Sequence, residues 1–278
     1  MLFQDIKNGR FYLGDCLEVM KEIPDGVVDM ILCDLPYGTT ACKWDSIIEL
    51  SELWKQYWRI TKGNAAIVLT ASQPFTTVLI ASQLNNFKVE WIWRKNAGSN
   101  FGTVKYQPMK EHESCLVFGK GLICYNPIMQ ERAEAGKAIV KAGFKNKPKD
   151  KPSEVYSDGA LNKGFNSSHL DKDLRYPSSV QNFNRERGLH PTQKPVLLFE
   201  YLIKTYTNKN EIVLDNCAGS GTTAIACENT NRKWICIEKE EEYANKAVKR
   251  ILNHNVQPQQ ILAQEPETFV IEDIAVNE

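Results

Sequence analysis

A glycine-rich segment is the first part of the chain whose residue types could do chemistry. It reads D-N-C-A-G-S-G-T-T from Asp215 to Thr223, and it lies between an apolar run and a helical pattern. Glycines at a strand-to-helix turn let the backbone approach a ligand closely, and the helix N-terminus offers unpaired N–H groups. Glu238 ends the next apolar run, where a carboxylate can accept hydrogen bonds from ribose hydroxyls. The pattern predicts a site for an adenosine-type cofactor.

These residues do not select one cofactor. Gly219, Gly221 and Ala224 also match the glycine fingerprint of nicotinamide dinucleotide sites. A nicotinamide-dependent oxidoreductase is therefore an alternative at this point.

A second segment, Asp34-Leu35-Pro36-Tyr37, follows the apolar run VDMILC. It is expected at the carboxyl end of a strand, where open α/β sheets bind ligands. The segment supplies a carboxylate acceptor, a stiffened turn and an aromatic face. An exocyclic amine on a nucleobase is a poor nucleophile, because its lone pair is delocalised into the ring. Two acceptors would orient its hydrogens, and an aromatic face would hold an extruded base by stacking.

Together with H-P-T-Q-K-P at 190–195, the two segments resemble the motifs of amino-group DNA methyltransferases that use S-adenosylmethionine. D-L-P-Y is similar to their catalytic D-P-P-Y, and the glycine-rich segment to their D-P-F-x-G-S-G-T-T loop. The order, with the catalytic box first and the cofactor loop last, is that of the beta group. The resemblance covers residues 10–119 and 190–250. It implies methyl transfer to the N6 amine of adenine in double-stranded DNA, by direct displacement with base flipping.

The resemblance also implies roles for individual residues. Asp34 and the Leu35 carbonyl would accept the amine hydrogens, Pro36 would set the turn, and Tyr37 would stack on the base. Asp15 would lie near the cofactor adenine. The remaining cofactor-binding residues would be Thr192, Lys194, Asp215, Cys217, Ala218, Gly219, Ser220, Gly221, Thr222 and Glu238.

The chain departs from the family pattern at two positions. Leu35 replaces the first proline of the box, but Pro36 still restricts the preceding residue to extended φ and ψ. Cys217 replaces the phenylalanine that usually packs beside the cofactor, which favours weaker cofactor binding. Neither change removes a reacting group.

Four other interpretations remain open from the sequence. N4-cytosine methylation poses the same chemical problem, although those relatives more often have serine at position 34. Glutamine-methylating enzymes with N-P-P-Y carry the motifs in the reverse order. A nicotinamide oxidoreductase would leave Asp34–Tyr37 and 190–195 without a role, and a DNA-binding module without catalysis would not need Asp34.

Short apolar runs that alternate with helical patterns predict the elements that position these motifs. Strands are expected at 10–15, 28–34, 65–70, 89–94, 114–119, 211–215 and 233–238. Helices are expected at 16–23, 46–62 with Ser46 as N-cap, 73–84, 195–206, 221–229 and 241–252. Strands separated by helices require crossover connections. The fold class is therefore α/β, a doubly wound, mostly parallel sheet of the Rossmann-like methyltransferase type.

Residues 120–189 interrupt this alternation. They are polar, carry 13 Lys+Arg against 8 Asp+Glu, and are too long for an ordinary connection. We interpret them as a target-recognition insertion between a catalytic half (1–119) and a cofactor-binding half (190–253). Residues 254–278 form an acidic tail that is expected to be mobile. In the insertion, Lys145, Lys147, Lys149 and Lys151 are candidate phosphate contacts, with a solvated loop as the alternative.

Composition places limits on these hypotheses. With 42% hydrophobic and 24% charged residues, a wholly disordered chain is excluded. No cysteine pair has C-x-x-C spacing and no Cys/His set has zinc-finger spacing, so we expect no metal site and reduced, mostly buried thiols. No apolar run suits a signal peptide or a membrane span, so a cytoplasmic protein of bacterial or phage origin is expected. Relatives are often homodimers, but the sequence leaves the oligomeric state open.

Overall fold

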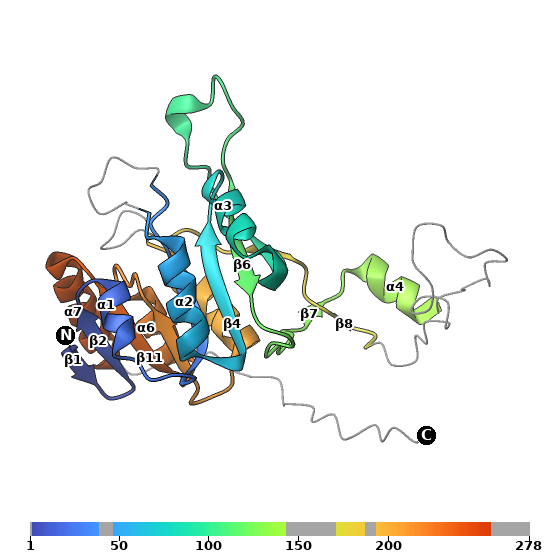
Figure 1. Ribbon diagram of the computed structural model, residues 1–278. Helices are drawn as coiled ribbons and strands as arrows, with labels where there is room; N and C mark the ends of the chain where they lie inside the picture. Colours follow the sequence, from blue (N-terminus) through green and yellow to red (C-terminus); the bar gives the residue numbers. More distant parts are fainter. Residues whose placement is uncertain (1, 39–46, 143–170, 187–192, 257–278) are drawn as a thin grey trace, which may run out of the picture.

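A nine-stranded sheet forms the centre of the computed structural model, which describes residues 2–38, 47–142, 171–186 and 193–256 (Figure 1). Within this sheet, as far as the structure describes the chain, only the pairs β1–β2, β4–β6 and β5–β6 are antiparallel, so the predicted mostly parallel sheet is confirmed. In spatial order the strands are β1 (Leu2–Ile6), β2 (Gly9–Leu13), β11 (Lys233–Glu238), β10 (Ile212–Asp215), β3 (Val28–Asp34), β4 (Thr61–Ala71), β6 (His112–Phe118), β5 (Phe87–Arg94) and β9 (Val180–Asn182).

Helices cover both faces of this sheet. One face packs against α1 (Cys16–Lys21), α2 (Leu50–Ile60) and α3 (Phe75–Ser82), and the other against α5 (Val196–Tyr206), α6 (Thr222–Asn229) and α7 (Glu241–Val256). Successive residues of β3 alternate between the two cores, because side chains along a strand point to opposite faces. Met30 and Leu32 join the core under α5–α7, and Ile31 and Cys33 the core under α1–α3. The doubly wound architecture is confirmed.

The two chemical motifs lie at the ends of adjacent parallel strands. Strand β3 pairs with β10, with Met30 opposite Val213 and Ile31 opposite Leu214. From β3 the chain crosses through α2 to β4 on one side, and from β10 it crosses through α6 to β11 on the other. The strand order therefore reverses between β3 and β10. A crevice for a ligand is expected at the carboxyl ends of the strands at such a switch point.

Several helix boundaries differ by a few residues from the predicted ones, and the start of α2 is one of them. The helix expected over 46–62 begins only at Leu50, and its N-cap is Glu49, whose carboxylate accepts a hydrogen bond from the Ser51 amide at 3.2 Å. Ile47 and Ile48 are not helical, and Ser46 lies outside the described residues. A carboxylate satisfies an otherwise unpaired amide and favours the positive end of the helix dipole, so the later start is well capped.

Three parts of the structure have no counterpart among the predicted elements. Strand β1 forms a hairpin with β2, in which Ile6 pairs with Gly9 and the turn lies at 7–8. Strand β9 comes from the predicted insertion and pairs with β5 at the sheet edge. In the same insertion, β7 (Gln130–Glu131) pairs with β8 (Leu174–Arg175), next to α4 (Glu134–Ala142).

Several predictions fall on residues that the structure does not describe. These are the four lysines Lys145, Lys147, Lys149 and Lys151, residue Thr192, and the tail from 257 onward. Among the described residues, none of the helices combines the length and the apolar character that a bilayer crossing needs.

Candidate active site

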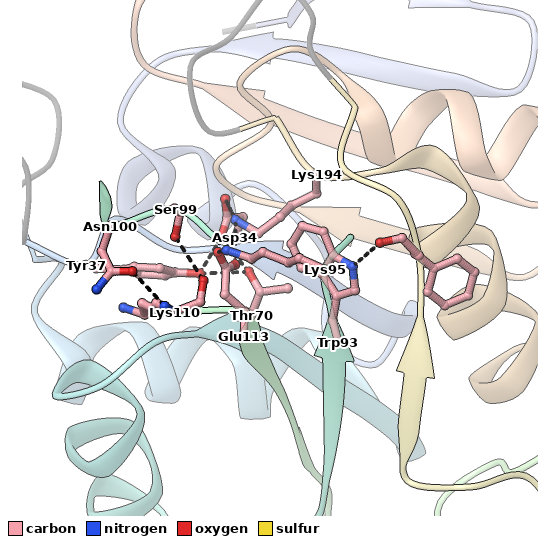
Figure 2. Close-up of polar contacts among 11 residues, drawn as sticks. Asp34, Tyr37, Thr70, Trp93, Lys95, Ser99, Asn100, Lys110, Glu113 and Lys194 are labelled. Carbon is pink, nitrogen blue, oxygen red and sulfur yellow. Dashed lines mark hydrogen bonds and ion pairs between the residues drawn. The ribbon is translucent and has the colours of Figure 1, made fainter. Parts of the chain in front are cut away.

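Asp34 ends β3 and is held by hydroxyl groups on one side of its carboxylate. Thr70 lies opposite it in the β3–β4 ladder, and the hydroxyls of Thr70 and Tyr37 both donate to Oδ1, the latter at 2.7 Å. The Asp34 side chain retains 21% of its exposure, so it can still meet a ligand. The predicted box therefore presents a positioned carboxylate at the switch point. Figure 2 shows this arrangement.

Lys194 donates a hydrogen bond to Oδ2, the other carboxylate oxygen of Asp34. Its Nζ lies 2.5 Å from Asp34 Oδ2 and 3.4 Å from Glu113 Oε2, and Lys95 forms an ion pair with Glu113 (Figure 2). Negative and positive groups thus alternate from Asp34 through Lys194 and Glu113 to Lys95. The network is neutral as a whole, and its members come from β3, the segment before α5, β6 and the end of β5.

Charge pairing keeps the inner members of this network ionised. Burial alone would lower the pKa of Lys194, but the charges of Asp34 and Glu113 raise it above its usual value. Burial opposes ionisation of Glu113, yet Lys194 and Lys95 lower the pKa of this carboxyl. Burial, with the charges of Asp34 and Glu113, raises the pKa of Tyr37, so its phenol stays protonated and can donate.

The Asp34 carboxylate has one hydrogen-bond acceptor site left open. Each carboxylate oxygen has about two acceptor sites. Oδ1 already accepts from Tyr37 and Thr70, whereas Oδ2 accepts from Lys194 alone among the described residues. The free site on Oδ2 can accept a hydrogen from a ligand donor such as an amine.

The Tyr37 ring is supported on one side by Phe75. The two rings stack with centroids 5.4 Å apart and an interplanar angle of 30°, and Lys194 Nζ lies 5.6 Å from the Tyr37 centroid. Leu35 is buried and Pro36 half-buried, so the turn between Asp34 and Tyr37 is fixed against the core. The aromatic ring is thus held in place by contacts to both its hydroxyl and its face.

The glycine-rich loop between β10 and α6 is held from inside by Asp215. This side chain is buried and accepts from the Cys217 amide at 3.1 Å and from the Thr223 hydroxyl. Burial raises the pKa of Asp215 to about 6, although these hydrogen bonds act against the shift. Asp215 therefore shapes the loop rather than facing a ligand directly.

Two carboxylates lie at the carboxyl ends of the neighbouring strands β11 and β2. Glu238 ends β11 and accepts from the amides of Gly219 at 2.8 Å and Glu240 at 2.9 Å. Asp15 is exposed at the end of the adjacent β2, where it caps α1 and lies 3.6 Å from Lys239. Glu238 lies beside the partly exposed Gly219 at the carboxyl end of β11, a position that suits the ribose hydroxyls of an adenosine-type ligand. The residues present fit the expected cofactor.

Within the loop, Ala218, Ser220 and Thr222 are buried, whereas Gly219 and Cys217 remain partly exposed. Arg250 of α7 donates to the Ser220 carbonyl at 3.0 Å and to the Thr222 hydroxyl at 3.2 Å. Most side chains of the loop therefore pack against the protein, and the amides of Ala218 and Gly221 are also paired within it. Cys217 and Gly219 are the loop residues that remain partly exposed.

Gly221 has a different role from the one expected of a ligand-facing glycine. It adopts φ +74°, and a Cβ built there would lie 3.2 Å from both Ala247 Cβ and Ile251 Cδ1 of α7. Close approach of helix α7, not of a ligand, therefore requires glycine at this position.

The thiols are buried and protonated rather than reactive. Of the seven described cysteines, all free, five are buried and Cys124 and Cys217 are partly buried. Burial raises the pKa of Cys33 to about 12, so no thiolate is present there at neutral pH. In the described part of the chain there is no group of three or more His, Cys, Asp or Glu residues that could hold a metal ion.

Lys194 joins the two motifs. Its carbonyl accepts from the Thr222 hydroxyl of the glycine-rich loop at 3.4 Å, while its ammonium contacts Asp34 of the catalytic box. The resemblance assigned Lys194 to the cofactor, but the side chain lies on the catalytic carboxylate. Thr192, expected beside it, is outside the described residues.

Thr70, Lys95 and Glu113 are site residues that the sequence did not reveal. Thr70 of β4 meets Asp34 directly across the β3–β4 pair. Lys95 and Glu113 join the network because β6 inserts antiparallel between β4 and β5. Lys95 and Glu113 at the ends of two apolar runs were a weak signal, since charged residues at strand ends are usually solvated.

Comparisons with known proteins agree with this geometry. A family model for N6/N4 DNA methylases matches residues 28–249. The type II methyltransferase M2.MboI of Moraxella bovis is 28% identical over 283 residues, 91% of this chain and 90% of that protein. The DNA adenine methyltransferase YhdJ of Escherichia coli (strain K12) is 27% identical over 259 residues, 86% of this chain and 81% of that protein. The crystal structure of the M1.HpyAVI–SAM complex superposes with a TM-score of 0.58 at 25% identity, covering 87% of this chain and 98% of that one.

Proposed function

Since the chain belongs to the N6/N4 DNA methylase family, we propose that it transfers a methyl group to the N6 amine of adenine in duplex DNA. The observation that carries this proposal is the Asp34 carboxylate, which keeps one open acceptor site beside the glycine-rich loop. The methyl donor is S-adenosylmethionine, the cofactor of these enzymes.

The cofactor supplies a methyl group on a positively charged sulfur, which is open to attack by a weak nucleophile. The chain would hold it through the backbone around Gly219, with Glu238 on the ribose and Asp15 toward the adenine. Both carboxylates lie at the carboxyl ends of neighbouring strands. Cys217 would contact the cofactor from within the loop.

The target amine would be oriented by Asp34 and the Leu35 carbonyl. An amine hydrogen on the open site of Oδ2 would orient the nitrogen and help to localise its lone pair. Tyr37, Thr70 and Lys194 keep the carboxylate in place, so little reorganisation accompanies the reaction. Methyl transfer would be a direct displacement in which the nitrogen–carbon bond forms as the sulfur–carbon bond breaks, S-adenosylhomocysteine leaves, and the nitrogen loses a proton to solvent.

Adenine is favoured over cytosine by Asp34. Relatives that methylate the N4 amine of cytosine more often carry serine at this position, and YhdJ, one of the relatives, is named as an adenine enzyme. N4-cytosine methylation remains the second candidate, because the same family includes it.

Duplex DNA is the proposed substrate, and residues 120–189 are its proposed reader. Their excess of Lys and Arg suits a polyanion. DNA as substrate implies that the enzyme acts in the cytoplasm. A homodimer is proposed because relatives are often dimers.

The test is to express the full chain in a host whose DNA lacks methylated adenine and to digest the DNA for mass spectrometry. N6-methyladenine is expected, and sequencing of modified bases in the same DNA gives the recognition sequence. Finding only N4-methylcytosine would overturn the base assignment. Absence of any methylated DNA base would overturn the substrate class.

Asp34→Ala is the variant that tests the catalytic assignment. It removes an acceptor that touches the substrate, so turnover should fall by at least about 100-fold while S-adenosylmethionine still binds. Asp5→Ala, an exposed aspartate on β1, is the matched control and should leave turnover unchanged. Full activity of Asp34→Ala would contradict the assignment.

A further inference from the structure

A long hairpin joins β5 to β6 and projects from the carboxyl edge of the sheet. It comprises residues 95–111, and Figure 1 shows it extending beyond α3. Its middle forms a short helical turn, η2 (Phe101–Thr103). Neither the catalytic box nor the cofactor loop includes any part of it.

Polar contacts within the hairpin give it a defined shape. Asn100 crosses between its two arms, accepting from the Lys110 amide at 2.6 Å and donating to the Pro108 carbonyl at 3.0 Å. The Ser99 amide donates to the Lys110 carbonyl at 3.2 Å, and Gln107 donates to the Thr103 hydroxyl at 2.7 Å. The hairpin therefore keeps its shape without burying its apolar side chains.

Those apolar side chains face solvent. Tyr106 is 87% exposed and Phe101 63% exposed, and Val104 and Met109 are exposed beside them. Residues 96–110 contain Lys105 and Lys110 and no acidic residue. Exposed aromatic groups on a stiff, basic hairpin are typical of a surface that meets a partner rather than water.

The base of the hairpin is attached to the catalytic network. The Lys95 amide donates to the Glu111 carbonyl at 2.7 Å, and the Lys95 side chain pairs with Glu113. Glu113 in turn contacts Lys194, which holds Asp34. A chain of ion pairs thus leads from Lys95 at the hairpin base, through Glu113 and Lys194, to the Asp34 carboxylate.

We propose that the tip of this hairpin, Phe101 with Tyr106, enters the DNA duplex beside the target base and fills the space that the base leaves when it flips out. The inference rests on the proposed DNA methylation and names the part of the chain that opens the duplex. Apolar side chains that wedge between base pairs offset the loss of base stacking. Lys105 and Lys110 would contact the flanking phosphates.

Charge and position favour DNA over a second copy of this chain as the partner. A protein interface usually excludes lysine from its core, whereas lysines beside aromatic groups suit a nucleic acid. The hairpin also lies at the edge where the flipped base must enter.

The test uses the full-length Phe101→Ser/Tyr106→Ser variant on two duplexes that carry the recognition sequence found by methylation mapping. In one duplex the target base is paired normally, and in the other it lies opposite an abasic position. The matched control is Leu122→Ser, which removes a 92% exposed apolar side chain beyond the other end of β6. All substituted side chains are exposed, so the fold should persist.

On the paired duplex, the single-turnover rate of the double variant should fall by about tenfold or more, with Leu122→Ser unchanged. On the abasic duplex, where the base is already unpaired, the reduction should be within about threefold. With 2-aminopurine as target and S-adenosylhomocysteine as cofactor, the wild-type protein should raise the fluorescence and the double variant should not.

An equal reduction on both duplexes, or none on either, would overturn the wedge. A change of oligomeric state in the double variant, with an unchanged rate on the paired duplex, would assign the tip to a protein interface instead. If the wild-type chain methylates neither duplex, the proposed function fails, which is a separate result.

Discussion

Lys194 is the residue where the catalytic and cofactor motifs meet. It is buried, it contacts Asp34 at 2.5 Å, and its carbonyl accepts from Thr222 of the glycine-rich loop. A buried ion pair adds little to the net free energy of folding, but removal of one partner leaves a charge without compensation. The contribution of Lys194 here is to fix the position of the Asp34 carboxylate.

Lys194→Met should therefore lower kcat by roughly 100-fold, because the carboxylate loses its fixed position. Binding of S-adenosylmethionine, measured by calorimetry, should change much less. Lys194→Arg retains the charge and should recover part of the rate.

A control variant distinguishes an effect on the position of the Asp34 carboxylate from a general loss of stability. Lys62→Met removes the partner of another buried carboxylate, Asp29, far from the site. It should lower the melting temperature with little effect on kcat. If Lys194→Met behaves as Lys62→Met does, Lys194 is only structural.

Asp215 predicts a specific pH dependence. Burial raises its pKa from 3.8 to about 6, so the folded state binds a proton more tightly than the unfolded chain. The contribution of this group to stability is then fully present below pH 4 and is lost as the pH rises through 6.

Asp215→Asn keeps an acceptor for the Cys217 amide and removes the ionisation. Relative to wild type, the free energy of unfolding of the variant should rise by up to a few kcal/mol from pH 4 to pH 7. Urea titrations at several pH values measure this difference. A difference that stays constant with pH would show that Asp215 does not titrate as described.

At the scale of elements, the loop and α7 are packed against each other through Gly221. Its φ of +74° is unfavourable for other residues, and a Cβ would press on Ala247 and Ile251. Gly26 offers a comparison, because it has φ +63° but no atom within 4 Å of a built Cβ.

Gly26→Ala should lower the free energy of unfolding by about 1 kcal/mol, the cost of the left-handed backbone alone. Gly221→Ala should lower the free energy of unfolding by this amount and by about 1–3 kcal/mol more, because its Cβ crowds α7. Thermal or urea unfolding measures both. Equal effects of the two substitutions would mean that α7 moves aside without cost.

The elements also show how far local sequence patterns reach. Buried parallel strands such as β3 and β11 appear as largely apolar runs, so their positions followed from the sequence. Strand β9 has three residues, only one of them buried, and leaves no such pattern.

The same limit applies to the site. Asp34, Tyr37 and the glycine-rich loop are contiguous motifs and could be predicted. Glu113 and Lys95 reach Asp34 through the order of β4, β6 and β5, which no local pattern encodes.

At the scale of the whole molecule, a formal net charge of zero conceals an uneven distribution. Residues 120–189 carry a net charge of +5, from 13 basic and 8 acidic residues, and residues 254–278 carry five acids and no Lys or Arg. The rest of the chain is therefore neutral as a whole. Association with a polyanion should then depend on the insertion rather than on the chain as a whole.

The four lysines Lys145, Lys147, Lys149 and Lys151 provide the test. Replacing all four with glutamine should weaken binding to every DNA sequence alike, because phosphates carry no sequence information. The slope of log K against log salt should fall by about 0.9 for each phosphate that is no longer neutralised by a lysine. Exchange of four exposed lysines elsewhere, Lys7, Lys21, Lys55 and Lys233, is the matched control and should leave the slope unchanged. If both variants alter the slope equally, general charge attracts DNA and the insertion makes no direct contact through these lysines. If neither alters it, the phosphate contacts lie elsewhere, and Lys105 and Lys110 of the hairpin become the next residues to exchange.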